Sequence, residues 1–219
     1  MKRLALSFLV SLTLFWIVAC APRTAKLASI GAPPQGLTLA GLMENLASVR
    51  EVKGIAEMEF ISPAKKLDGP ASIAVSAGAM SVNVYSLGVL AGEFYETDGP
   101  DGHIITSDPP LSPLDKYLMV IGIRAGLMWW AADAGEVRAE SAEAGEVIVM
   151  RSVGSKTAID KRTLKPILRD VLLIDGRTLH VRYDDVVWLD GAWYPGRVEA
   201  VLDEHRLTIV FSEVTLGRR

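Results

Sequence analysis

The chain has 219 residues, of which 50% are hydrophobic and 22% are charged, and its formal net charge at pH 7 is −3. This composition is typical of a folded protein and not of a disordered one. The slightly acidic balance offers no basic surface, so we expect no nucleic-acid partner. The single cysteine excludes an intramolecular disulfide, so packing alone must hold the fold.

Residues 1–19 are predicted to form a secretory signal peptide. Two basic residues precede an apolar run over residues 4–18, which is shorter than the roughly 20 residues that a membrane-spanning helix needs. The run ends in "IVAC", residues 17–20, which is similar to the lipobox of bacterial lipoproteins. That resemblance implies cleavage before Cys20 and acylation of its thiol and of the new amino terminus, which anchors a chain in a membrane. The alternative is an uncleaved signal anchor with an incidental cysteine.

Residues 20–36 are predicted to be the lipidated amino terminus and a flexible tether, because prolines, glycines and other small residues dominate them. A single folded domain is expected over residues 37–219. It begins with a helix over residues 39–50, for which Thr38 is the predicted cap and in which apolar residues recur at three- and four-residue spacing.

The next part of the chain alternates apolar and polar residues, which predicts half-buried strands. The alternating segments lie at residues 52–61, 71–77, 79–85 and 89–97, and turn signals stand at residues 69–70 and 98–102. Strand signals return from residue 146 to residue 216, with turns at residues 160–163, 175–176, 190–191 and 203–205. Short connections between about ten successive strands predict an antiparallel meander.

A second helix is predicted over residues 113–132, with Ser112 as its cap and Pro113 at its first position. This segment is apolar almost all round, so we expect it to lie between two apolar surfaces. Gly122 and Gly126 are positions at which it could kink or split. The following small and acidic residues, 133–146, predict a solvated loop or an edge hairpin. The predicted class is α+β, with a curved antiparallel sheet covered by helices.

Signatures of enzymes are scarce. The three histidines are far apart and lack metal-ligand spacing, so we expect neither a metal nor another cofactor. Ser62 and Lys65 match the S-x-x-K of penicillin-recognising enzymes, which leaves a hydrolase as one alternative, but Pro63 within the motif favours a turn. Asp184 and Asp185 would point to opposite faces of a strand, so a solvated turn is the better interpretation. We expect that the protein is not an enzyme.

Apolar residues stand where a hairpin normally carries polar ones. Leu87, Val89 and Leu90 surround Gly88 between two predicted strands. An apolar hairpin tip indicates contact with a membrane or a partner. The alternative is that Gly88 forms a bulge inside one long buried strand.

The helix at residues 113–132 and the inner face of the sheet are both apolar, which leaves two interpretations. Either the core is tightly filled, or the sheet forms an incomplete barrel with an open cavity for acyl chains beneath the helices. The candidate lining residues are the inward members of the alternating or helical sets: Met58, Phe60, Val82, Val84, Phe94, Leu118, Ile121 and Trp129.

The order of these segments resembles the bacterial LolA/LolB-like family of lipoprotein carriers and receptors, especially its lipidated outer-membrane receptors. The resemblance spans most of residues 20–219 and rests on "LASVREVKGIAEMEF", "VNVYSLGVLAGEFYETDG" and "GAWYPGRVEAVLDEHRLTIVFSEVTL". It implies a half-open β-barrel covered by helices. The family's exposed apolar loop, its membrane-insertion loop, falls on Leu87 beside Gly88, although residues 85–86 are Tyr-Ser where the family often has Ser-Pro. Cys20 matches the acylation site, and Ala21 in place of an aspartate implies sorting to the outer membrane in enteric-type bacteria.

The resemblance also implies a function. A membrane-anchored, monomeric lipoprotein would bind acyl chains in its cavity, receive lipoproteins from a periplasmic LolA-like carrier and insert them into the outer membrane, on the side that faces the periplasm. The alternative is an envelope lipoprotein that transfers nothing and acts as a scaffold or accessory subunit through a peptide-binding groove.

Overall fold

The computed structural model describes residues 26–86, 88–99, 102–108, 110–131, 138–141 and 146–218. Cys20, the signal peptide and Leu87 lie outside these residues. Within them the elements are α2 (Leu39–Ala47), β1 (Val49–Ile61), β2 (Lys66–Ser76), β3 (Ala79–Ser86), β4 (Val89–Gly99), β5 (Gly102–Asp108), α3 (Pro113–Leu127), β6 (Arg138–Ser141), β7 (Val147–Ser152), β8 (Ser155–Asp160), β9 (Pro166–Leu172), β10 (Thr178–Asp184), β11 (Val187–Leu189), β12 (Ala192–Tyr194), β13 (Arg197–Leu202) and β14 (His205–Arg218).

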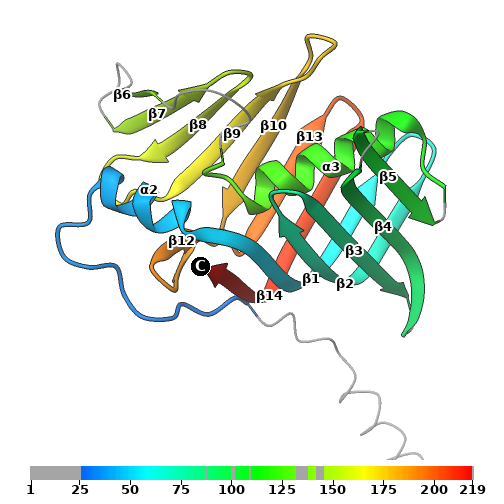
Figure 1. The fold of residues 1–219 in the computed structure, drawn as a ribbon, viewed down its shortest axis with the longest axis horizontal. Coiled ribbons are helices and arrows are strands. Elements are labelled where there is room, and N and C mark those ends of the chain that lie inside the picture. Colours follow the sequence, from blue (N-terminus) through cyan, green and yellow to red (C-terminus); the bar gives the residue numbers. More distant parts are fainter. Residues whose placement is uncertain are drawn as a thin grey trace, which may run out of the picture.

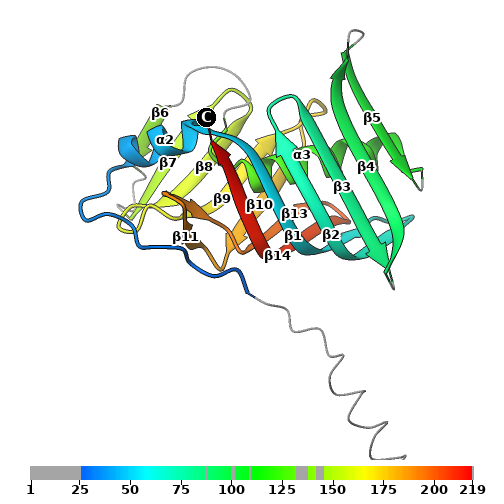
Figure 2. The same ribbon diagram turned by 60° about the horizontal axis from the view of Figure 1, so that its bottom comes forward.

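One twelve-stranded antiparallel sheet dominates the fold. Its strand order is β5-β4-β3-β2-β1-β14-β13-β10-β9-β8-β7-β6, and β11 and β12 form a separate hairpin. The two edge strands, β5 and β6, do not pair with each other, so the sheet is open and not closed into a barrel. It is strongly bent, and α3 lies across its inner face against β10, β13 and β14 (Figures 1 and 2). The predicted class, a curved antiparallel sheet covered by helices, is confirmed.

Several strand boundaries differ from the sequence prediction. The ladder between β1 and β2 continues through Gly69 and Pro70, where a turn was predicted, because Met58 and Glu57 pair opposite them. The turn preferred for Asp184 and Asp185 agrees with the structure, because Asp185 has a φ of 50° and separates β10 from β11. β5 and β6 were not predicted as strands, although an edge hairpin was one interpretation of residues 133–146.

Helix α3 begins as predicted and stays in one piece. The Ser112 hydroxyl accepts a hydrogen bond from the Asp115 backbone N–H, and Pro113 occupies the first turn. Gly122 and Gly126 do not split the helix. They face β13 and β14, and a Cβ atom on Gly126 would lie 2.6 Å from Cγ1 of Val198. The glycines therefore let the helix backbone approach the sheet closely.

Replacing Gly126 by valine is expected to lower the free energy of unfolding by about 1–3 kcal/mol, because the added atoms collide with Val198 in a packed interface. Equilibrium denaturation in urea measures this change. Gly41→Ala in α2 is the matched control, since its Cβ would meet only the Thr38 hydroxyl at 3.4 Å. That change is expected to be neutral or slightly stabilising. Equal stability of Gly126→Val and the wild type would show that α3 is not held this close to the sheet.

The amino-terminal segment is more ordered than the predicted flexible tether. Leu27 is buried, and the Ile30 backbone N–H donates a hydrogen bond of 2.8 Å to the Trp188 carbonyl. Ile30 also forms an isolated parallel bridge with Leu189. The tether prediction fails for these residues because the β11–β12 hairpin leaves backbone groups with which an extended segment can pair.

Candidate functional site

Seven of the eight residues predicted to line an open cavity are buried and form packed core instead. The eighth, Ile121, is partly buried against the same hydrophobic cluster and also lines the hollow beside α3 that is described below. A hollow of about 40 Å³ touches Val82, Val84 and Phe94, and one of about 10 Å³ touches Phe60 and Leu118. The larger has space for water and neither has space for an acyl chain.

Among the described residues, no open void of the expected kind lies between the seven buried residues. The physical reason is side-chain size. Large buried side chains occupy the space between α3 and the sheet, among them Trp129, Phe60, Met58, Met119 and Leu127.

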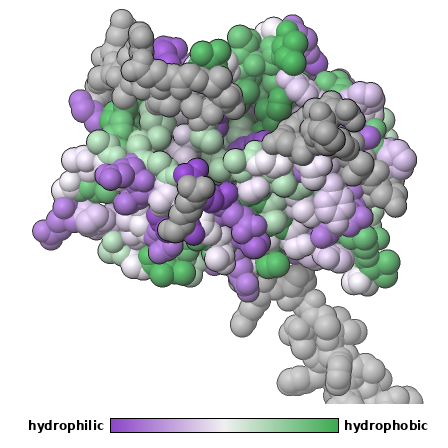
Figure 3. All heavy atoms as spheres, viewed as in Figure 1, coloured by the Kyte–Doolittle hydropathy of each residue, from purple (hydrophilic) through white to green (hydrophobic). Residues whose placement is uncertain are grey.

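A larger hollow lies beside α3. Its volume is about 320 Å³, at the lower end of the range of small-molecule pockets. It lies between one side of α3, the inner face of β9 and the β2–β3 turn, and we call it the α3 hollow. Its lining residues are Ala77, Ile121, Arg124, Ala125, Met128, Ala131, Arg169 and Val171. Figure 3 shows this side of the molecule, with weakly hydrophobic residues gathered around a depression near its centre.

Arg124 joins α3 to the wing of the sheet that contains β1–β5. Its Nε lies 2.6 Å from Oε2 of Glu96 on β4, a carboxylate with no exposure to solvent. Its Nη1 donates to the carbonyl oxygens of Ser76, at 2.8 Å, and Ala77, at 3.3 Å. A buried ion pair with added hydrogen bonds of this kind makes the separation of helix and sheet costly.

Arg169 connects α3 to the other part of the sheet, which contains β9. It is a buried residue on β9, and its guanidinium donates to the carbonyl oxygens of Met128, at 3.3 Å, and Ala131, at 2.8 Å. It also donates to the Ser155 hydroxyl at 3.2 Å. A cation at the carboxyl end of a helix is stabilised by the partial negative charge of the last carbonyl groups.

The sequence interpretation missed Arg124, Glu96 and Arg169, although a signal was present. Arg124 is the only charged residue between residues 117 and 131. Glu96 and Arg169 occupy inward positions of alternating strands, two residues from buried Phe94 and Val171. Charged residues are rarely buried unless they are paired or functional, so these exceptions to the pattern mark the site.

The apolar segment around Gly88 is a hairpin tip and not a bulge. Ser86 pairs with Val89, and Gly88 has a φ of 78°. Val89 and Leu90 remain 69% and 48% exposed. We call Gly88, Val89 and Leu90 the β3–β4 tip; Leu87 lies outside the described residues.

The β3–β4 tip and the start of the described chain lie on the same side of the molecule (Figures 1 and 2). The β9–β10 turn lies on the opposite side and carries another apolar side chain, Ile174, with 94% exposure.

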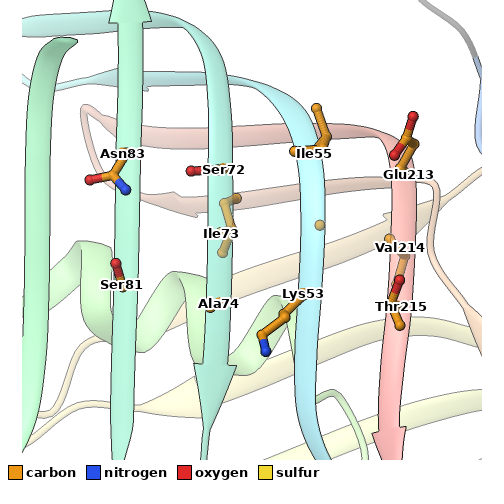
Figure 4. A pocket seen from close by; sticks show the side chains of 11 residues that line it. Lys53, Ile55, Ser72, Ile73, Ala74, Ser81, Asn83, Glu213, Val214 and Thr215 are labelled. Carbon is orange, nitrogen blue, oxygen red and sulfur yellow. The ribbon is translucent and has the colours of Figure 1, made fainter.

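A second hollow, of about 360 Å³, lies on the outer face of the sheet, across β1, β2, β3 and β14 (Figure 4). Small polar side chains from Ser72 and Ser81 form part of its lining, together with Lys53, Glu213 and Asn83. Among the residues that the structure describes, the buried Asn83 Oδ1 atom has no hydrogen-bond partner. Apolar side chains also line this outer hollow, namely those of Ile55, Ile73, Ala74 and Val214, so its lining is mixed and offers polar groups to a ligand.

The remaining candidate groups occupy structural positions. Ser62 and Lys65 form the β1–β2 turn, and the Lys65 ammonium contacts the Pro110 carbonyl and not the Ser62 hydroxyl. His180 and His205 lie beside Asp170 and Asp115, at 2.8 and 3.4 Å. No cluster of three metal-binding side chains occurs among the described residues. No helix in the described ranges is long and apolar enough to cross a membrane.

No protein-family model matches the sequence, and no curated protein matches it. The chain is similar in structure to a DUF1329 family protein from Desulfovibrio piger, at 12% identity and a TM-score of 0.46, over 80% of this chain and 89% of that one. It is similar to a LolA superfamily protein from Nitrosomonas europaea, at 12% identity and a TM-score of 0.45, over 84% and 96%. It is also similar to an outer membrane lipoprotein-sorting protein domain from Vibrio parahaemolyticus, at 11% identity and a TM-score of 0.46, over 81% and 92%.

Proposed function

We propose that this protein is a non-enzymatic lipoprotein, anchored through Cys20 in the outer membrane and facing the periplasm, that binds acyl chains and passes them on. In the specific form that the sequence suggests, it receives lipoproteins from a periplasmic LolA-like carrier and inserts them into the outer membrane. The observation that carries the proposal is the α3 hollow, a cavity of about 320 Å³ between a largely apolar helix and the inner face of an open sheet.

Burial of hydrocarbon supplies the affinity. Each methylene group that leaves water contributes about 0.8 kcal/mol, so even part of an acyl chain in the α3 hollow binds appreciably. Transfer then requires only that the next site bind the chain somewhat better. No cofactor takes part in this mechanism.

A full acyl chain requires α3 to move away from the sheet. Besides the two arginines, the Tyr183 hydroxyl donates to the Ala125 carbonyl at 2.6 Å, and the Trp129 indole N–H donates to the Trp193 carbonyl at 3.0 Å. These contacts hold the helix over the packed core. In the proposed function, this structure corresponds to the closed form of the carrier, and the α3 hollow is the point of entry.

Native mass spectrometry tests acyl binding directly. Residues 21–219 are exported behind a signal peptide that is not lipidated, which retains every described residue. Co-purified lipid, or uptake of an added triacylated lipopeptide, supports the proposal. The proposal would be wrong if the spectrum showed the mass of the protein alone, with no co-purified lipid and no uptake of the lipopeptide.

The β3–β4 tip is proposed to enter the membrane during delivery, with Leu87, Val89 and Leu90 as the inserting residues. The double substitution Leu87→Glu and Val89→Glu is expected to slow delivery of a bound lipopeptide to vesicles at least about tenfold, because burying an apolar side chain is worth about 1.5–3 kcal/mol and a carboxylate opposes burial. Uptake of the lipopeptide should not change. Transfer of a fluorescent lipopeptide measures both steps.

The control for this experiment is Ile174→Glu. It removes an even more exposed apolar side chain from the opposite side of the molecule, and we expect normal delivery. If the tip variant delivers as fast as the control, the β3–β4 tip has no role in insertion.

The packed core also supports a second candidate function, a scaffold or accessory lipoprotein that binds a peptide and carries no lipid. The outer hollow, with the buried and unpartnered Oδ1 of Asn83, is the place where a peptide N–H would bind (Figure 4). Asn83→Ala distinguishes the two functions, because it should weaken capture of a partner peptide and leave uptake of lipid unchanged.

A further inference from the structure

The α3 hollow combines apolar walls with two cationic side chains, which is more than the burial of a hydrocarbon chain needs. Ile121, Ala125 and Met128 follow one another along one side of α3 and supply an apolar wall. Arg124 and Arg169 line the same hollow and are anchored on opposite wings of the sheet. Burying a charge costs free energy unless it is paired, and Glu96 and backbone carbonyl groups satisfy only part of the hydrogen-bonding capacity of Arg124.

Arg124 retains capacity for a further hydrogen bond. Its Nε and Nη1 donate to Glu96 and to the backbone of the β2–β3 turn, but its Nη2 is buried and has no hydrogen-bond partner within the described part of the chain. A guanidinium has five N–H donors in a planar fork that matches the geometry of a carboxylate or a phosphate. A buried donor without a partner calls for an explanation, and a bound acceptor is one.

Arg169 reinforces this arrangement from the other side. Two of its three described partners are the carbonyl oxygens of Met128, the residue that caps α3, and of Ala131, in the segment after the helix, so it holds the chain that leaves the helix and carries its charge beside the hollow. An anionic group between the two guanidinium groups would interact favourably with both, in surroundings largely shielded from water.

We propose that the α3 hollow selects a single-chain amphiphile whose head group is anionic, a carboxylate or a phosphate ester, with the head at Arg124 and Arg169 and the first part of the tail along Ile121, Ala125 and Met128. This inference rests on the proposed binding of acyl chains and adds the chemical class of the ligand. It predicts that neutral acyl groups, including the amide- and ester-linked chains of a lipoprotein, are weaker ligands of this hollow than an anionic lipid.

The test uses the mature, lipidated full-length protein in phosphatidylcholine vesicles. Three photoactivatable probes share the same tail and diazirine position: hexadecanoic acid, hexadecyl phosphate and hexadecanol. Peptide mapping after irradiation measures the labelling of α3 and β9, normalised to the probe content of the vesicles. We expect at least one anionic probe to label these elements about tenfold more than the alcohol, since hydrogen bonds to charged groups are the strong ones. Preference for the acid indicates a free fatty acid, and preference for the phosphate indicates a lipid phosphate.

Substitutions then test whether Arg124 is responsible for the selectivity toward anionic probes. Arg124→Gln should reduce labelling by the anionic probes to the level of the alcohol. If thermal unfolding shows that Arg124→Gln is poorly folded, Arg124→Lys, which retains a cation beside Glu96, serves as the second variant. Arg177→Gln is the control, because Arg177 is an exposed residue that pairs with Asp175 and Asp203 outside the hollow.

The possible failures are distinct. Equal labelling by all three probes would overturn selection of an anion and leave acyl binding standing. No labelling of α3 or β9 by any probe would overturn both this inference and the proposed function. Unchanged selectivity in both Arg124 variants would overturn the assignment to Arg124.

Discussion

Replacing Arg124 by alanine is expected to lower the free energy of unfolding by about 3 kcal/mol, near the lower end of the range for breaking a buried ion pair. The Glu96 carboxylate is fully buried and would lose a charged partner 2.6 Å away. The β2–β3 turn would lose two hydrogen bonds to the helix as well. The lower end of the range applies because the Arg124 side chain is itself 24% exposed. Equilibrium denaturation in guanidinium chloride measures the change.

Arg177→Ala is the matched control for this experiment. That guanidinium also contacts two carboxylates at 2.7 Å, but on the exposed surface, where an ion pair contributes at most about 1 kcal/mol. The Glu96→Gln variant and the double variant complete a thermodynamic cycle with Arg124→Ala. Additive effects of Arg124→Ala and Glu96→Gln would contradict the proposed coupling of α3 to β4 through this pair.

Replacing Cys20 by serine is expected to abolish anchoring in the membrane. In the proposed function the anchor is the acyl chains on Cys20, and two or more chains are needed for an attachment that does not readily reverse. Incorporation of labelled palmitate and fractionation of membranes measure the effect. Uptake of palmitate by Cys20→Ser, or its retention in the outer membrane, would contradict the assignment of Cys20.

Ala21→Asp is the control that separates lipidation from sorting. It leaves Cys20 intact, so palmitate should still be incorporated. In an enteric-type bacterium the variant is expected to remain in the inner membrane. Because the described chain begins on the same side as the β3–β4 tip, it should then present that tip to the wrong membrane and fail to deliver cargo to the outer membrane.

The cavity is the point at which the sequence prediction and the structure diverge most. The inward residues of the alternating strands and of α3 were predicted correctly as inward, and nearly all of them are buried. Alternation and helical spacing report which side of an element a residue faces. They do not report how far apart two facing surfaces lie, so Phe60, Leu118 and Trp129 fit a packed core as well as an open cavity.

The periodic spacing of apolar residues could not predict the α3 hollow. The α3 hollow exists because the β2–β3 turn, the end of α3 and β9 meet, and these segments are distant in sequence. Arg124, Glu96 and Arg169 interrupt apolar patterns, so each was detectable as an exception. Only their spatial arrangement shows that Arg124 pairs with Glu96, whereas Arg169 binds the helix terminus.

The sequence by itself determined the local features: the Ser112 cap and Pro113 start of α3, the alternating strands with short turns and the single cysteine that follows a signal-like segment. These depend on interactions within a few residues, which composition and spacing record directly. The tertiary structure alone decided that the sheet bends around α3 until its interior is filled, that residues near Ile30 pair with the β11–β12 hairpin, and that two arginines meet at one hollow. Those outcomes depend on contacts between segments far apart in the chain, for which no single stretch of sequence carries a signal.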